Sequence, residues 1–154
     1  MVKRIILIVA IAMIAFSGVA LAADTASVNV SATVVGACKF INKGGVLPFG
    51  NLDPSVAGDV NNLSATQPTF WCTKNASYTI ADTGGAHDAG TTHRMIGATN
   101  SELIPYTITF SALGSGQGRD TTLSMNISGQ VLYADFKNAS ADSYSDTVTL
   151  SITP

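Results

Sequence analysis

Residues 26–34 alternate strictly between small apolar and small polar side chains. The apolar positions are Ala26, Val28, Val30, Ala32 and Val34, and the polar positions are Ser27, Asn29, Ser31 and Thr33. Because successive side chains of a β-strand point to opposite faces, this pattern predicts an extended strand that buries one face. Such a strand can pair within its own domain or complete a sheet in another chain, and the alternation alone leaves both arrangements open.

An apolar leader precedes this segment. Lys3 and Arg4 make a charged start, residues 5–16 form an unbroken apolar run, and Ala20 and Ala22 place small side chains at the two positions that a signal peptidase inspects, with cleavage after Ala23 as the alternative. This order is typical of a secretory signal peptide, so we expect residues 1–22 to be removed on export. An uncleaved membrane anchor is the alternative, because the apolar run nearly reaches the roughly 20 residues that span a bilayer.

The exported remainder is mildly acidic and has the size of one ordinary domain. Loss of the leader's basic residues changes the formal net charge from −2 to about −4, and charged residues make up only 12% of the chain. A scattered, weakly acidic surface argues against nucleic acid or anionic lipid as a partner.

The two cysteines of the chain, Cys38 and Cys72, both lie in the exported part. In an oxidising compartment a disulfide between them is the default expectation. Free thiols, or half of a metal site, are the alternative, but the Cys-x-x-Cys spacing that zinc sites favour is absent. We therefore predict a Cys38–Cys72 disulfide that stabilises the fold by roughly 3 to 4 kcal/mol in the chain-entropy description.

The exported chain is rich in Ser, Thr, Ala, Gly and Asn and has almost no helical periodicity, which predicts an all-β fold. Strands are expected at residues 27–35, 46–49, 69–73, 77–81, 105–111, 122–128, 130–136 and 146–153. Turns rich in glycine, asparagine and proline separate several of these runs. Many short strands between frequent turns favour a β-sandwich of the immunoglobulin-like class.

Two of these runs identify a buried face by alternation. The apolar side chains that share a face are Tyr106, Ile108 and Phe110 in one run and Val148, Leu150 and Ile152 in the other. We predict that these six residues line the core or a groove that opens onto it. Val131, Tyr133 and Phe136 are expected to extend the core.

Two stretches are harder to place. Phe70 and Trp71 are adjacent, so one of them must leave the core face of its strand. Residues 82–100 contain glycines and paired threonines, and we expect a surface loop there.

His87, Asp88 and His93 lie in that expected loop and raise the question of a metal or acid–base site. Two histidines six residues apart with one carboxylate do not match a recognised zinc-ligand spacing. We therefore expect exposed loop histidines, with no metal and no cofactor. Neither a Gly-x-Ser-x-Gly nor a His-Glu-x-x-His motif occurs, so the chain is not expected to be an enzyme.

Seven elements occur in the order that one known family shows. They are the leader; the alternating segment that ends at Val35, three residues before Cys38; Leu47-Pro48-Phe49-Gly50-Asn51-Leu52-Asp53-Pro54; Thr69-Phe70-Trp71-Cys72-Thr73 followed by Tyr78-Thr79-Ile80; Arg94-Met95; Pro105-Tyr106-Thr107-Ile108; and Ser143-Tyr144-Ser145-Asp146-Thr147-Val148-Thr149-Leu150-Ser151-Ile152. In these elements the chain resembles the spore coat protein U domain family, which includes the major subunits of archaic chaperone–usher pili. The resemblance covers essentially the whole mature chain.

The resemblance implies an incomplete immunoglobulin-like β-sandwich that is completed by donor-strand exchange. It divides the mature chain into a donor segment, residues 23–36, and a pilin domain, residues 37–154. The donor side chains that it implies as plugs for a neighbour's groove are Val28, Val30, Ala32 and Val34.

The family also implies a function and partners. The chain is expected to be a structural pilus subunit, exported through the periplasm to a cell-surface fibre or secreted, that serves adhesion and biofilm formation. The implied partners are identical or related pilus subunits, a periplasmic chaperone, an outer-membrane usher, and a surface receptor or abiotic surface. The alternative is a non-polymeric secreted coat protein or carbohydrate-binding module that uses the loops around Trp71 or Tyr144, or the stretch at residues 82–100, in place of strand exchange.

Two positions depart from the family pattern. Leu52 stands where an aromatic residue is common, and the sequence closes in Thr153-Pro154 where such domains often finish with an aromatic residue. The second departure concerns the strand that a chaperone is expected to hold, because proline cannot donate a backbone hydrogen bond.

Overall fold

The computed structural model describes residues 23–64 and 66–154. The expected signal peptide, residues 1–22, lies outside these residues. The chain divides into a unit that ends at Thr33 and a unit from Val34 to Pro154, and each is described by itself. In the described residues, no helix is long and apolar enough to cross a membrane.

In the first unit, residues 23–33 form neither helix nor strand. Their side chains are exposed: Val28 is 84% exposed and Val30 is 90% exposed. The run that we predicted as a strand at residues 27–35 has no sheet partner in the described part of its own chain. Its apolar positions are therefore left without cover.

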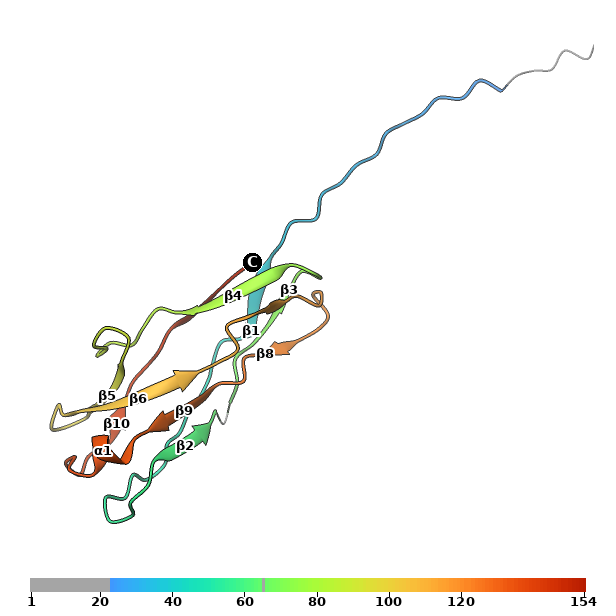
Figure 1. Cartoon of the computed structure of the whole chain (residues 1–154). Coiled ribbons are helices and arrows are strands. Elements are labelled where there is room, and N and C mark those ends of the chain that lie inside the picture. Colours follow the sequence, from blue (N-terminus) through green and yellow to red (C-terminus); the bar gives the residue numbers. More distant parts are fainter. Residues whose placement is uncertain (1–22, 65) are drawn as a thin grey trace, which may run out of the picture. The chain divides into compact units, whose positions relative to one another are not determined.

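The second unit is almost entirely β-structure, which confirms the all-β prediction (Figure 1). Its strands are β1 (Cys38–Asn42), β2 (Val60–Leu63), β3 (Thr69–Cys72), β4 (Ser77–Asp82), β5 (His93–Gly97), β6 (Leu103–Thr109), β7 (Leu113–Ser115), β8 (Leu123–Ser124), β9 (Ser128–Val131), β10 (Tyr144–Ser145) and β11 (Leu150–Thr153). A short helix, α1 (Tyr133–Phe136), lies between β9 and β10.

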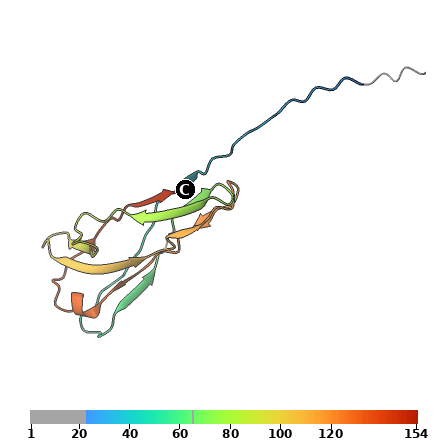
Figure 2. The same cartoon turned by 45° about the horizontal axis from the view of Figure 1, so that its top comes forward.

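The strands pair antiparallel in three sheets. Their orders are β1-β3-β8, β10-β5-β6-β9-β2 and β11-β4-β7. The register places Cys38 opposite Cys72 and Ile152 opposite Ile80. Figure 2 shows the final strand β11 beside β4, so the end of the chain lies on the sheet that faces β1-β3-β8.

One core lies between the β1-β3-β8 and β11-β4-β7 sheets. Its buried side chains are Phe70, Cys72, Ile80, Met125 and Ile127. The Phe70 ring meets the rings of Phe40 and Tyr78 edge to face, with centroids 6.2 and 5.0 Å apart. Because side chains from both sheets meet here, the two sheets form the sandwich that the sequence predicts.

A second core lies under the five-stranded sheet. Its buried side chains are Met95, Ile104, Tyr106, Val131 and Phe136, and Phe49, Leu52 and Val148 pack against them. The sequence prediction that Val131 and Phe136 belong to the core is confirmed, since they are 0% and 2% exposed.

The Phe70–Trp71 pair separates as strand geometry requires. Phe70 is 1% exposed in the first core, whereas Trp71 is on the other face of β3 and is only partly buried. The Arg119 guanidinium lies 5.4 Å from the Trp71 ring centroid, so a cation–π contact covers this indole.

The strand predicted at residues 130–136 is wrong in its second half. β9 ends at Val131, and α1 begins at Tyr133, whose backbone N–H donates to the Asp59 carboxylate at 2.8 Å. The helical turn brings Tyr133 and Phe136 together edge to face at 5.5 Å, and it lets Phe136 reach the core. The three-residue spacing of these aromatics suits a helix better than a strand.

The surface loop predicted at residues 82–100 is also wrong in part, because β5 lies within it. The alternating burial of β5 puts His93, Met95 and Gly97 inside, and this strand pairs with both β6 and β10. The expectation that both histidines are exposed loop residues fails for His93, which is 8% exposed.

Three other predicted strands are shorter than expected. Residues 46–49 contribute only an isolated bridge between Val46 and Thr66, and residues 122–128 contribute only β8 and the first residue of β9. Residues 146–149 leave the ladder between β10 and β11. Strands β1, β2, β7 and β10 are not among the predicted strands, because each has only two to five residues.

Candidate functional site

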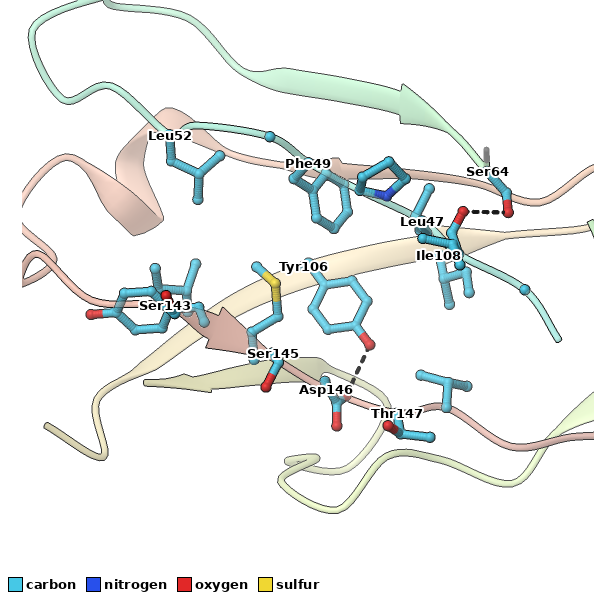
Figure 3. Close-up of a pocket in the computed structure, with 18 of the residues that line it drawn as sticks. Leu47, Phe49, Leu52, Ser64, Tyr106, Ile108, Ser143, Ser145, Asp146 and Thr147 are labelled. Atoms are coloured by element: carbon cyan, nitrogen blue, oxygen red, sulfur yellow. Dashed lines mark hydrogen bonds between the residues drawn. The ribbon is translucent and has the colours of Figure 1, made fainter. Parts of the chain in front are cut away.

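A long groove opens between two stretches of chain that no strand joins (Figure 3). Its volume is about 1240 Å³. One edge is formed by residues 45–52 and the other by residues 142–150. The floor consists of apolar side chains from both cores, namely Ile104, Tyr106, Ile108, Ile127 and Phe136.

Both groove edges present unpaired backbone. In the described residues, the N–H groups of Leu47 and Phe49 on one edge and of Thr147 and Val148 on the other donate no hydrogen bond. Unpaired donors beside an apolar floor are costly in a finished domain and form a template for an added strand. The groove therefore has the chemistry of a missing strand position.

The structure brings four of the six predicted core or groove residues to this groove. Tyr106, Ile108, Val148 and Leu150 line it. Phe110 and Ile152 instead pack against the first core. The alternation identified the correct face of both runs, since Thr107, Thr109, Thr147, Thr149 and Ser151 are exposed.

Tyr106 ties the floor to the second edge. Its hydroxyl donates to the Asp146 carboxylate at 2.9 Å (Figure 3). Burial, together with this hydrogen bond and the Asp146 charge, raises the pKa of Tyr106 well above its ordinary value. The hydroxyl therefore stays protonated, and the Tyr106 ring, 5.8 Å from Phe49, also supports the first edge.

Two carboxylates fix the start of the second edge. Asp142 accepts hydrogen bonds from the backbone N–H groups of Thr99 and Asn100 at 2.8 and 3.1 Å. Glu102 accepts from the Ser140 N–H at 2.9 Å and from the Tyr144 hydroxyl at 3.2 Å. These bonds lower the pKa of both carboxylates, with the backbone donors as the main cause.

Acid should loosen this anchor. The pKa of Asp142 is below its ordinary value of 3.8 in the fold, so its contribution is present above pH 3.8 and is lost as the pH falls through the lower, folded value. We expect Asp142→Asn to lower the urea midpoint at pH 7 and the difference from wild type to shrink by pH 2.5. Asp120→Asn is the control, because Asp120 is exposed and accepts no hydrogen bond in the described structure. A difference that stays constant with pH would contradict this role.

The first edge packs closely against Gly129 of β9. A Cβ on Gly129 would lie 2.7 Å from Leu47 Cδ2 and 2.7 Å from the Thr107 carbonyl, so only glycine lets Leu47 pack onto β9. The Ser64 hydroxyl donates to the Val46 carbonyl at 2.7 Å, and the Asn62 amide donates to the Pro48 carbonyl.

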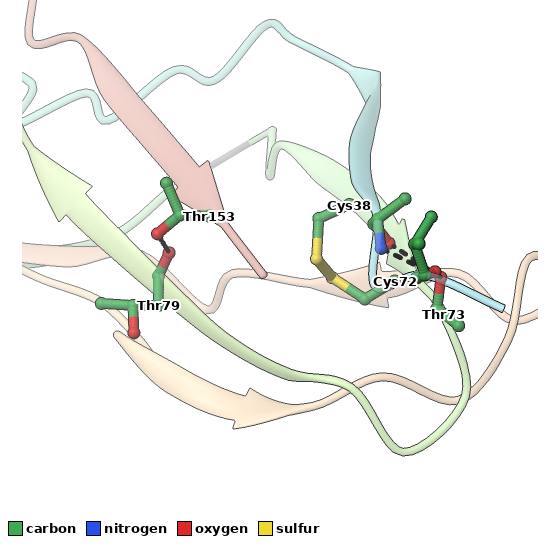
Figure 4. Close-up of a disulfide and its surroundings, with 7 residues drawn as sticks. Cys38, Cys72, Thr73, Thr79 and Thr153 are labelled. Atoms are coloured by element: carbon green, nitrogen blue, oxygen red, sulfur yellow. Dashed lines mark hydrogen bonds between the residues drawn. A yellow bond between two sulfur atoms is a disulfide. The ribbon is translucent and has the colours of Figure 1, made fainter. Parts of the chain in front are cut away.

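A disulfide fixes β1, the strand that leads into the same edge. Cys38 and Cys72 are bonded, which confirms the pairing predicted from the sequence (Figure 4). Beside it, the Thr73 N–H donates to the Ala37 carbonyl at 2.8 Å and the Ala37 N–H donates to the Thr73 hydroxyl at 3.1 Å. β1 is therefore joined to β3 by a covalent bond at the point where the chain enters the domain.

Comparison with known proteins places the chain in a family. A family model described as the Spore Coat Protein U domain matches residues 24–151. The chain belongs to the Spore Coat Protein U domain family. The match includes the alternating segment as well as the groove-bearing unit. No curated protein matches this Spore Coat Protein U domain chain.

Among solved structures, this Spore Coat Protein U domain chain is similar to one from the archaic chaperone–usher Csu pili of Acinetobacter baumannii. That structure is the crystal structure of the CsuC–CsuE chaperone–tip adhesion subunit pre-assembly complex, with 16% sequence identity and a TM-score of 0.45. The match covers 78% of this chain and 40% of that chain, so this chain spans less than half of that chain's length.

Proposed function

We propose that this Spore Coat Protein U domain protein is a structural subunit of a chaperone–usher surface pilus. Each subunit inserts its residues 23–36 into the groove of a neighbour, and the chain of subunits grows by repeating this step. The observation that carries the proposal is the groove itself, which has an apolar floor and unpaired N–H groups along both edges.

The alternating segment matches this groove in length and chemistry. Residues 26–34 have the same number of residues as the groove edge from 142 to 150. An added strand pairs its backbone with both edges and directs every second side chain toward the floor. The side chains that point toward the floor are Val28, Val30, Ala32 and Val34. The side chains that point toward solvent are Ser27, Asn29, Ser31 and Thr33.

The energetics favour a durable joint. Full burial of one valine contributes on the order of 1.5 to 3 kcal/mol, so three valines supply about 5 to 9 kcal/mol before the cost of association. The ladder hydrogen bonds add a contribution that does not depend on sequence. The second edge is already fixed by Asp142, Glu102 and Tyr106, so little ordering is needed there when the strand enters.

The open groove also accounts for the proposed partners. An exposed apolar groove with unpaired edges promotes aggregation, so a subunit in the periplasm needs a temporary occupant. A chaperone strand fills the groove until an usher exchanges it for the next subunit's donor segment. The resulting surface fibre serves adhesion and biofilm formation.

Electrophoresis of surface material tests the proposal. Material treated with SDS but not heated should run as a ladder of regularly spaced bands, because the inserted strands resist detergent. Boiling should collapse the ladder to the monomer band. A monomer band under both conditions would contradict strand exchange and favour the non-polymeric secreted module.

A further inference from the structure

His93 occupies a buried acidic pocket beside the groove. It begins β5 and is 8% exposed, although its sequence neighbours suggested a loop. Its Nε2 atom lies 2.7 Å from an Asp82 oxygen at the end of β4. Its Nδ1 atom lies 3.1 Å from both oxygens of Asp88, which the intervening loop supplies.

A third carboxylate reaches this pocket from the groove edge. Asp146 Oδ2 accepts the Tyr106 hydrogen bond, whereas Asp146 Oδ1 is buried and has no hydrogen-bond partner in the described structure. One ligand atom each from Asp88, His93 and Asp146 lie within 4.8 Å of one another. A buried carboxylate oxygen without a donor is costly, so its position calls for a cation.

We propose that Asp88, His93 and Asp146 together bind one Zn²⁺ ion. An imidazole nitrogen and two carboxylate oxygens are ligand types that zinc accepts, and a water molecule can complete four-coordination. The nitrogen favours zinc over calcium, which takes oxygen ligands. The Nδ1 atom is the ligand, because Nε2 has the closer carboxylate on its other side.

The surrounding groups orient these ligands. A metal-binding histidine ordinarily donates its second N–H to a carboxylate, and Asp82 is placed to accept it. The Gly85 N–H donates to Asp88 Oδ2 at 2.7 Å, and the Tyr106 hydroxyl holds Asp146. Each of the three ligands therefore has its own positioning partner.

Two glycines make room for the carboxylates. A Cβ on Gly84 would lie 2.8 Å from Asp88 Oδ2, and a Cβ on Gly85 would overlap the Asp146 carboxylate. The carboxylates of Asp82, Asp88 and Asp146 therefore all lie close to the His93 ring. The neighbouring Arg94 donates to the carbonyl oxygens of His87 and Asp88 at 2.6 and 3.2 Å, and not to a carboxylate.

The site has a mechanical consequence. Asp146 belongs to the second groove edge, and Asp88 and His93 belong to the loop and strand behind it. A shared ion would connect the middle of that edge to the β4–β5 region. The edge is already held at its start by the Asp142 hydrogen bonds and at its end by the pairing of β11 with β4. From the sequence we expected no metal, because Asp146 is distant from Asp88 and His93 along the chain and only the fold brings the three together.

Calorimetry and thermal unfolding on the untagged exported chain test this proposal. After treatment with EDTA and dialysis, ZnCl₂ should bind with a stoichiometry of one and raise the unfolding temperature. His93→Gln and Asp146→Asn should each weaken Zn²⁺ binding at least 100-fold. Asp82→Asn should weaken it 10- to 100-fold, because it removes only a positioning partner.

Matched controls separate the site from general effects. His87→Gln and Asp120→Asn should bind Zn²⁺ like wild type, and circular dichroism should show that every variant keeps the β-fold. Absence of Zn²⁺ binding by the folded wild-type chain would overturn the proposal, as would binding that survives both His93→Gln and Asp146→Asn. The measurement concerns one subunit, so its result is independent of whether SDS-resistant ladders form.

Discussion

Val30→Asp is expected to abolish polymerisation while leaving the subunit folded. Val30 is the central apolar residue of the alternating segment and is 90% exposed in the free chain, so the domain's own core does not use it. In the proposed joint it is buried against a neighbour. The variant loses about 1.5 to 3 kcal/mol of burial, and burying an unpaired carboxylate costs several kcal/mol more.

The total of about 4 kcal/mol or more corresponds to roughly a thousandfold weaker joint. Unheated SDS samples of the variant should therefore show monomer only, and fibres should be absent from the cell surface by electron microscopy. The urea midpoint of the purified subunit should match that of wild type.

Ser31→Asp is the matched control, since it adds the same charge one residue away on the solvent side of the proposed strand. Ladders from Ser31→Asp together with monomer from Val30→Asp would support the assigned face. Normal ladders from Val30→Asp would refute strand exchange through this residue. Equal loss from both variants would show that the predicted face is wrong.

Removal of the disulfide is expected to have the second large effect. Cys38 and Cys72 are separated by 34 residues, and closing a loop of this length stabilises by about 3 to 4 kcal/mol in the chain-entropy description. Domains are typically stable by only 5 to 15 kcal/mol, so this is a large fraction. Cys38→Ala/Cys72→Ala should therefore unfold at a much lower urea concentration.

The wild-type chain unfolded in the presence of dithiothreitol provides the control, because reduction removes the bond without changing the buried side-chain volume by much. Both samples should lose a similar amount of unfolding free energy. We also expect both to form fewer ladders, since the bond fixes β1, which leads directly into the first groove edge. A loss below 1 kcal/mol in both would contradict this role.

The sequence predicted those parts of the fold that depend on local alternation. Tyr106 and Ile108 were assigned to the correct face, and so were Val148 and Leu150, because each run is buried on one side only. Alternation could not separate groove from core: Phe110 and Ile152 share those faces but pack against the first core and do not line the groove. That distinction depends on which neighbouring strand is missing.

Other features depend on contacts between distant residues. α1 was mistaken for a strand because Val131, Leu132 and Tyr133 form an apolar run that suits either structure, and the Asp59 carboxylate at its start is remote in sequence. β5 was missed because glycine and threonine surround it, although its pairing with β6 and β10 buries His93. The acidic pocket likewise forms only in the folded chain, where Asp146 of the groove edge lies close to Asp88 and His93.

The placement of the exposed segment and the groove on one chain gives a fibre two unlike ends. A contact between two different surfaces of the same subunit is heterologous, so it propagates in one direction and does not close in a symmetric dimer. Under the proposed exchange, one end of every fibre carries an unfilled groove and the other carries an unused strand. Growth continues at the end with the unfilled groove, because the next subunit's donor segment enters it. The opposite end is finished by a terminal subunit that offers a groove but has no donor strand of its own.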